Sequence, residues 1–240
     1  MNSLAGGYDS VLLKLSGNAL ADDGGAGFND EQLSYISTEI KETLSSECKL
    51  GVVLGAGNIL RGASFSTTAQ SRLQADNAGM VATVVNGLVL QQALEDVGVA
   101  AYVCSAFNIG GIVPAFNRRE CLSQLQSGNV VILTGGTGNP LFTTDTAAVL
   151  RAVQLRMDAV FKATRVNGVY SADPELDTNS RFYENLSYDQ VLESGLNIMD
   201  FAAIDLCRTH NLPVRVFNFK GKGNLKNAVS GEKIGTLIGG

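Results

Sequence analysis

The stretch Val11-Leu12-Leu13-Lys14-Leu15-Ser16-Gly17 decides the fold of this chain, because an apolar run of strand length ends in a turn that contains glycine. The same arrangement recurs at Leu50–Leu54, which runs into Gly55-Ala56-Gly57-Asn58, and at Val130–Thr134, which runs into residues 135–139. Open α/β sheets bind their ligands at the carboxyl ends of the strands, where these turns lie. We therefore interpret the three turns as candidate ligand-binding loops.

Segments with helical periodicity separate these strands. Asn29, with Gln32 three residues on, predicts a helix start similar to a capping box, and residues 70–97 predict a long helix. Further strands are predicted at 101–105, 159–163, 214–217 and 236–238, and further helices at 118–126, 144–156, after Ser187, and at 201–209 with Asp200 as the cap. This alternation predicts βαβ units and a largely parallel sheet in an α/β fold.

The composition limits the classes of protein to consider. A chain of 240 residues that is 45% hydrophobic is long enough for one large domain or two tightly joined lobes. Its net charge of −5 offers no broad attraction for a nucleic-acid backbone, so we expect no nucleic-acid partner. The four cysteines form no C-x-x-C pair, and we expect them to be buried thiols in a reducing cytoplasm. No signal peptide or membrane-spanning run is recognisable, so we expect no membrane partner.

Two lysines stand out because they lie inside apolar strands. Lys14 and Lys162 are costly there unless each ammonium group reaches the strand end and meets an anion. Asp145, at the start of a predicted helix, is placed to orient one of them. Plainer interpretations remain open, namely a lysine that faces solvent from an edge strand and an aspartate that complements a helix dipole. We favour cationic clamps for a phosphate that is being transferred.

Several other reaction types fit the sequence poorly. There is no G-x-x-x-x-G-K-[ST] motif, no G-x-G-x-x-G, no G-x-S-x-G and no H-E-x-x-H. The single histidine, His210, lies near a predicted helix end, where a role as C-terminal cap is favoured. Phosphoryl transfer to an acceptor that is itself a phosphate needs no strong base, since that nucleophile is ionised near neutral pH. Lysines, backbone N–H groups and Mg²⁺ suffice for such chemistry.

At this point the motifs resemble a known family. Residues 14–17 (KLSG), 55–58 (GAGN) with Arg61-Gly62, and 137–145 (TGNPLFTTD) resemble the amino-acid-kinase superfamily, and within it the bacterial uridylate (UMP) kinases. Residues 162–164 (KAT), 168–170 (GVY), 172–174 (ADP), 199–200 (MD) and 213–218 (PVRVFN) extend the resemblance over about Val11 to Ile238.

The resemblance implies a three-layer α/β/α sandwich with a largely parallel central sheet. It implies one domain over 1–240, with a UMP-binding lobe over about 1–155 and an ATP-binding lobe over about 156–240. The implied activity is the ATP-dependent phosphorylation of UMP to UDP in pyrimidine nucleotide biosynthesis, with Mg²⁺ as cofactor. The resemblance further implies a cytoplasmic homohexamer, with GTP or UTP as possible effectors.

The resemblance also implies roles for individual residues. The implied catalytic residues are Lys14, Asp145, Lys162 and Arg61. The implied ATP-binding residues are Lys14, Ser16, Gly17, Gly57, Arg61, Thr164, Tyr170 and Asp173. The implied UMP-binding residues are Ala56, Asp76, Thr137, Gly138, Asn139, Pro140, Leu141, Phe142, Thr143 and Thr144. No metal ligand is implied.

Two positions depart from the family pattern. Asn18 replaces a usual glutamate, and Ala56 replaces the middle glycine of the second loop, which keeps its N–H contact if Ala56 has φ below zero. Two alternatives to a UMP kinase stay open. One is a relative that phosphorylates a carboxylate, a carbamate or a small alcohol, against which Arg61 and Asp76 argue. The other is a non-catalytic nucleotide-binding or storage protein on the same fold.

Overall fold

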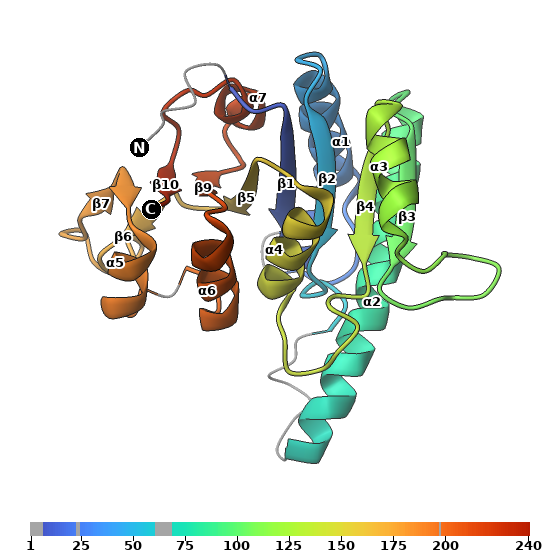
Figure 1. Cartoon of the computed structure of the whole chain (residues 1–240), viewed down its shortest axis with the longest axis horizontal. Coiled ribbons are helices and arrows are strands. Elements are labelled where there is room, and N and C mark those ends of the chain that lie inside the picture. The colour runs from blue at the N-terminus through green and yellow to red at the C-terminus, as the bar shows by residue number, and fades with distance from the viewer. Residues whose placement is uncertain (1–6, 23–24, 61–68, 197) are drawn as a thin grey trace.

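The computed structural model describes residues 7–22, 25–60, 69–196 and 198–240, and an eight-stranded sheet forms its centre (Figure 1). The strand order is β3-β4-β2-β1-β5-β9-β10-β8. The strands are β1 (Ser10–Leu15), β2 (Lys49–Leu54), β3 (Ala101–Ser105), β4 (Val130–Thr134), β5 (Ala159–Thr164), β8 (Asn185–Leu186), β9 (Val214–Asn218) and β10 (Thr236–Ile238). A separate antiparallel pair joins β6 (Val169–Tyr170) to β7 (Phe182–Tyr183).

The sheet is largely parallel, as the sequence predicts. Strands β3, β4, β2, β1, β5 and β9 run parallel to their neighbours, whereas β10 is antiparallel to β9 and β8 is parallel to β10. Strand β1 lies between β2 and β5, so the chain winds outward from β1 in one direction and from β5 in the other. Such a switch point is where open α/β sheets form their ligand crevice.

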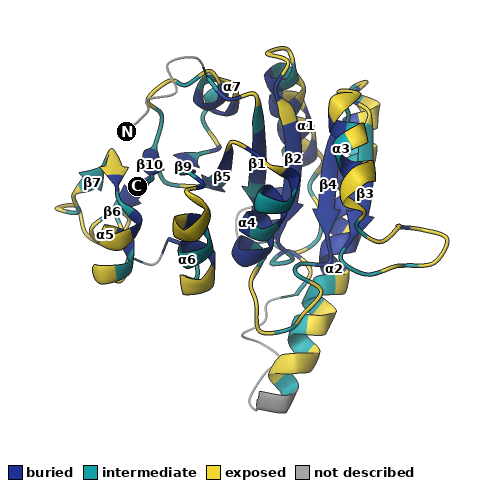
Figure 2. Cartoon of the chain, viewed as in Figure 1, coloured by how far each residue is buried: buried dark blue, intermediate teal, exposed yellow. Residues whose placement is uncertain are grey.

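Helices cover both faces of the sheet, which confirms the three-layer prediction. Helices α1 (Asp30–Leu44), α2 (Ala69–Asp96) and α7 (Asn224–Val229) contribute to one hydrophobic core, together with Val11, Leu13 and Leu15 of β1. Helices α3 (Arg118–Gln126), α4 (Thr144–Leu155), α5 (Tyr188–Glu193) and α6 (Phe201–His210) contribute to the other, together with Leu12. Successive residues of a strand point to opposite faces of the sheet, so both layers of helices bury the strands, which are dark blue in Figure 2.

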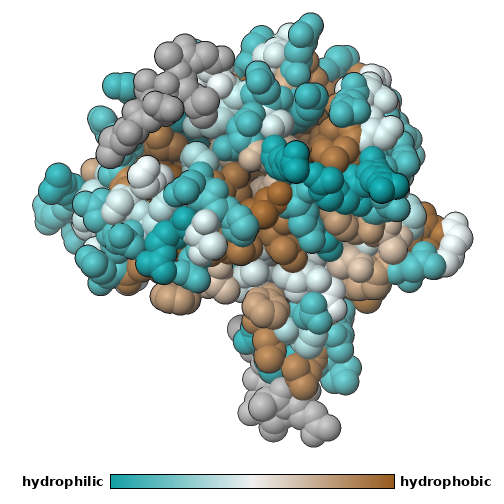
Figure 3. Space-filling view, viewed as in Figure 1, coloured by the Kyte–Doolittle hydropathy of each residue, from teal (hydrophilic) through white to brown (hydrophobic). Residues whose placement is uncertain are grey.

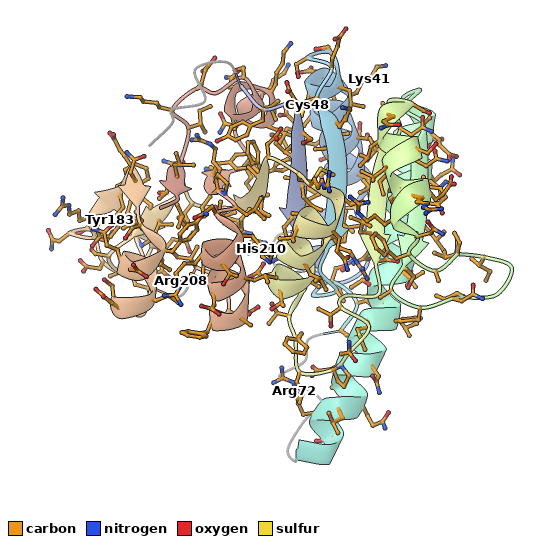
Figure 4. All side chains as sticks on the ribbon, in the orientation of Figure 1. Lys41, Cys48, Arg72, Tyr183, Arg208 and His210 are labelled. Atoms are coloured by element: carbon orange, nitrogen blue, oxygen red, sulfur yellow. The ribbon has the colours of Figure 1, made fainter. Side chains whose placement is uncertain are left out.

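The predicted helix starts agree with the structure. The Asn29 side chain accepts a hydrogen bond from Gln32 N, and Ser187 with Gln190 forms a complete capping box. Asp200 caps α6 by accepting from Ala203 N. The interpretation of His210 as a cap is wrong, because His210 is the last, exposed residue of α6 and Asn211, in the left-handed conformation, is the cap (Figure 4).

Five short elements are absent from the sequence prediction. They are the 3-10 helix η1 (Gly17–Leu20), β6, β7, β8 and α7. Each has between two and six residues, which is too short for a hydrophobic period to show.

Helix α2 extends well beyond the edge of the sheet, and its far part is exposed (Figures 1 and 2). None of the helices in the described part of the chain is long and apolar enough to span a bilayer. All four cysteines are free and buried, in agreement with the prediction from their spacing.

Candidate active site

Lys14 and Lys162 occupy matching positions on neighbouring strands. They are register partners in the parallel pair of β1 and β5, and both side chains point to the α4 face of the sheet. Their strands lie on either side of the switch point, so the two ammonium groups meet at the crevice that the topology creates. The interpretation of either lysine as a solvent-facing edge residue is wrong, since β1 and β5 each have a neighbour on both sides.

One carboxylate joins the two lysines. Asp145, the second residue of α4, has Oδ1 2.8 Å from Lys14 Nζ and Oδ2 2.8 Å from Lys162 Nζ. The three side chains are only 12–15% exposed. A carboxylate that bridges two cations fixes both in space, so an anionic ligand at this place would meet ammonium groups that are already oriented.

Burial and the charges within this triad shift the pKa values of Asp145 and Lys162. Burial raises the pKa of Asp145, but the ammonium groups of Lys14 and Lys162 together outweigh burial and hold this pKa below its ordinary value. Burial is also the main influence on Lys162, and it lowers the pKa of that lysine despite the neighbouring Asp145. Asp145 is therefore ionised near neutral pH.

Residues that the sequence analysis did not assign to the site support this triad. Lys162 Nζ also donates a hydrogen bond to the carbonyl oxygen of Ile198. Asp200 accepts from the hydroxyl group of Thr143, and from the Thr146 hydroxyl at 2.7 Å and 2.8 Å. The start of α6 is thereby tied to the start of α4, where Asp145 lies. The cap at Asp200 was visible in the sequence, but its second role depends on a contact between distant segments.

The first two glycine loops pack directly against each other. A Cβ atom on Gly17 would lie 2.6 Å from Gly57 N, and one on Gly57 would lie 2.8 Å from Asn18 Oδ1. The glycines are thus required here for close approach, because Gly17 and Gly57 do not adopt positive φ. Ala56 has no positive φ either, so it meets the condition under which alanine keeps the N–H contact.

A large pocket opens beside Lys162, with a volume of about 590 Å³, and we call it the β5–β6 pocket. Three of the residues that the resemblance assigns to ATP line it, namely Thr164, Tyr170 and Asp173. Its wall runs from Lys162 through residues 164–175 to Val216, so the second half of the chain builds it. A cavity of this size suits a nucleotide base and ribose.

A smaller cavity of about 320 Å³, the α2 pocket, lies against helix α2. Five residues that the resemblance assigns to UMP line it: Ala56, Asp76, Phe142, Thr143 and Thr144. Asp76 also pairs with Arg72 on the protruding part of α2, with Nε and Oδ1 2.8 Å apart (Figure 4). Thr144, which precedes Asp145 in α4, is one of the residues that line this pocket.

The remaining residues assigned to UMP lie outside the wall of the α2 pocket. Leu141 N donates to Asp76 Oδ2 at 2.9 Å, which holds the third loop against α2. The Thr137 hydroxyl donates to the Asn139 carbonyl at 3.0 Å, so Thr137, Gly138, Asn139 and Pro140 form a local turn. Gly136 and Phe142, on either side of this turn in the sequence, line the pocket, but the turn itself does not contribute to the lining.

A third cavity of about 300 Å³ adjoins η1, and Lys14, Ser16, Lys162 and Thr164 are among its lining residues. Arg61 lies outside the described residues, so its predicted role in catalysis and ATP binding has no geometry here. Within the described ranges, no group of three or more His, Cys, Asp or Glu residues is arranged to hold a metal ion.

A lysine–aspartate–lysine triad at the switch point of a parallel sheet, with Lys162 lining one pocket and Thr144 lining another, is an arrangement that suits phosphoryl transfer. The model of the Amino acid kinase family matches residues 9–218. The uridylate kinase of Escherichia coli (strain K12) is 46% identical over 231 residues, covering 96% of each chain. The uridylate kinase of Colwellia psychrerythraea is 45% identical over 96% of this chain and 94% of its own. A crystal structure of UMP kinase from Bacillus anthracis superposes with a TM-score of 0.93 at 35% identity, over 97% of this chain and 96% of that one.

The chain therefore belongs to the amino acid kinase family, and within it to the uridylate kinases.

Proposed function

We propose that this chain catalyses the ATP-dependent phosphorylation of UMP to UDP, a step of pyrimidine nucleotide biosynthesis. The observation that carries this proposal is the bridge of Asp145 between Lys14 and Lys162, with Lys162 in the wall of the β5–β6 pocket and Thr144, next to Asp145, in the wall of the α2 pocket. The β5–β6 pocket would receive the adenine and ribose of ATP. The α2 pocket would receive UMP.

The reaction transfers the γ-phosphoryl group. The bond between the γ-phosphorus and the β,γ-bridging oxygen breaks, and an oxygen of the UMP phosphate forms the new bond. Lys14 and Lys162 would stabilise the negative charge on the transferred group, and Asp145 would hold both ammonium groups in place. The second pKa of the UMP phosphate is about 6, so this nucleophile is ionised near neutral pH and the enzyme needs no strong base.

We propose Mg²⁺ as the cofactor. Mg²⁺ in such sites is bound by substrate phosphates and water with one or two carboxylates, and it demands no cluster of protein ligands. The described residues contain no such cluster, and Asp145 is already paired with Lys14 and Lys162. When bound, the ion would neutralise charge on the ATP phosphates.

We also propose that the chain has two lobes within one domain. The residues around the α2 pocket range from Ala56 to Thr144, and those around the β5–β6 pocket range from Lys162 to Val216. This separation supports a UMP-binding lobe over about 1–155 and an ATP-binding lobe over about 156–240.

The proposed assembly is a cytoplasmic homohexamer that responds to GTP or UTP. Leu73, Val81 and Val85 expose apolar surface on helix α2, and Figure 3 shows apolar surface on the projection that this helix forms. This exposed apolar surface supports a contact between subunits through α2. Activity assays with and without each of these nucleotides test the effector response.

The experiment that tests the function is an acceptor panel with ATP and Mg²⁺. We expect turnover of UMP and far slower turnover of CMP, because a site that hydrogen-bonds uracil leaves polar groups unpaired with cytosine. Turnover of a carboxylate or carbamate instead would assign the chain to another activity of the family. Binding of ATP without turnover of any acceptor would support a storage protein.

A further inference from the structure

Two buried asparagines meet behind the second glycine loop. Asn58 is the last residue of that loop, and Asn86 lies on the inner side of α2, with exposed fractions of 1% and 0%. Asn58 Nδ2 donates to Asn86 Oδ1 at 3.0 Å, and Asn86 Nδ2 donates to Asn58 Oδ1 at 2.8 Å. The two carboxamides therefore form a closed, reciprocal pair.

The other hydrogen bonds of this pair go to backbone carbonyl groups. Asn86 Nδ2 donates to the Gly55 carbonyl at 2.7 Å, and Asn58 Nδ2 donates to the Gly27 carbonyl at 2.9 Å. The backbone of Asn58 accepts in turn from Gly27 N at 2.9 Å. One buried pair thus joins three segments, which are the glycine loop, the segment around Gly27 and helix α2.

Burial of two carboxamides adds little stability over apolar residues of the same shape, because their hydrogen bonds only replace those made with water. What the pair does provide is a defined position for the backbone. A carbonyl group held by a buried donor cannot rotate without leaving that donor unpaired. The Gly55 carbonyl is held in this way from one side of the loop.

The loop that the pair holds lies between Gly17 and the α2 pocket, which Ala56 lines. On one side it packs against Gly17, whose added Cβ would lie 2.6 Å from both Gly57 N and Asn58 Oδ1. On the other side, Asn86 lies one helical turn from Thr83, which lines the α2 pocket and accepts from Gly135 N at 2.8 Å. A shift of the pair would therefore move the loop relative to Gly17 and to the α2 pocket.

We propose that Asn58 and Asn86 act as one positioning unit that holds the peptide groups of Gly55–Gly57 in register with the transferred phosphate. This inference rests on the proposed function for its kinetic consequence only. Neither side chain is placed in contact with substrate, so the pair acts through the loop.

The kinetic test uses Asn58→Leu, Asn86→Leu and the double variant. Misplacement of a phosphate-binding loop is expected to lower kcat by about 10- to 100-fold, with a smaller change in the KM for UMP. Residues that act as a unit are not additive, so the double variant should be no slower than the slower single variant. Thr43→Val is the matched control, because this buried hydroxyl on α1 donates only to Glu39 within its own helix. Additive losses, or an equal loss in Thr43→Val, would overturn the proposal.

A second test does not depend on activity. Amide hydrogen exchange in the ligand-free protein should become faster at Gly27 and Ile59 in Asn86→Leu, whereas Thr43→Val should leave both amides unchanged. These amides donate to Asn58 O and Ala56 O, so they report on the loop directly. Unchanged exchange would refute the positioning unit even in an active enzyme. Faster exchange in a protein that does not phosphorylate UMP would refute the proposed function alone.

If Asn86→Leu does not fold, Asn86→Asp serves both tests. Aspartate keeps the acceptor for Asn58 Nδ2 but loses the hydrogen bonds that Asn86 Nδ2 donates to the Gly55 carbonyl and to Asn58 Oδ1. We expect it to show the same faster exchange and lower kcat, and wild-type values for both would overturn the proposal.

Discussion

At the scale of single residues, Lys14 carries the most direct prediction. Replacing Lys14 by alanine removes one of the two oriented cations and leaves Asp145 paired with Lys162. We expect kcat to fall by about 100-fold or more, the loss typical of one preorganised electrostatic donor. Steady-state assays with saturating ATP and UMP measure this, and circular dichroism checks that the fold is intact. A Lys14→Ala enzyme with wild-type kcat would exclude Lys14 from catalysis.

The lowered pKa of Lys162 predicts a pH dependence. Burial is its main cause, and it makes the ammonium group lose its proton at a lower pH than a lysine in water, whose pKa is about 10.4. As pH rises through the folded pKa, the triad loses one positive charge and kcat should fall. Lys162→Arg keeps its charge to higher pH, so the alkaline fall in kcat should move upward in that variant. If kcat fell over the same alkaline pH range in the wild type and in Lys162→Arg, the fall would not be due to Lys162.

At the scale of elements, Asp200 links two helices. It caps α6 and accepts hydrogen bonds from Thr143, the cap of α4, and from Thr146 on that helix. Asp200→Ala should therefore cost about 2–3 kcal/mol of unfolding free energy, the sum of a lost cap and of hydrogen bonds to a charged group. It should also lower kcat, because the start of α4 carries Asp145. Chemical denaturation and kinetics measure the two effects.

Ser187→Ala is the matched control for that prediction. It removes the cap of α5, whose side-chain hydrogen bonds run only between Ser187 and Gln190 in the described contacts. The expected cost is about 1 kcal/mol with kcat unchanged. An equal loss of kcat in both variants would show that Asp200 acts only through stability.

The elements also show how far the sequence predicts this structure. Strand β1 and helix α2 are predicted to within a residue, because β1 is an apolar run of strand length and α2 carries apolar residues along its length. The lysines are recognisable by the cost of burying them in strands. Their shared partner is less certain from sequence, since Asp145 alone also fits a helix-dipole role. The Asp200 contacts and the Asn58–Asn86 pair are not predictable, because they join segments tens of residues apart.

At the scale of the whole molecule, the protruding helix predicts the assembly. Val85→Asp places a charge on exposed apolar surface of α2, where Val85 is 44% exposed. If copies of the chain meet through α2, this variant should have a lower mass by light scattering than the wild type. Leu176→Asp is the control, since Leu176 is 87% exposed on a loop far along the chain and should leave the mass unchanged. A hexamer that tolerates Val85→Asp would place the contact elsewhere.

The pairing of β1 with β5 has a consequence for how the chain can be divided. Within the sheet, residues before about 156 meet residues after it along this single seam, from Val11 opposite Ala159 to Lys14 opposite Lys162. A protein cut at the turn between α4 and β5 would keep one lysine on each fragment, with Asp145 on the first. Neither fragment alone would hold the bridged triad, and activity would return only when β1 of one fragment pairs with β5 of the other. Formation of UDP after the separated fragments are mixed would show that β1 and β5 have paired and rebuilt the triad.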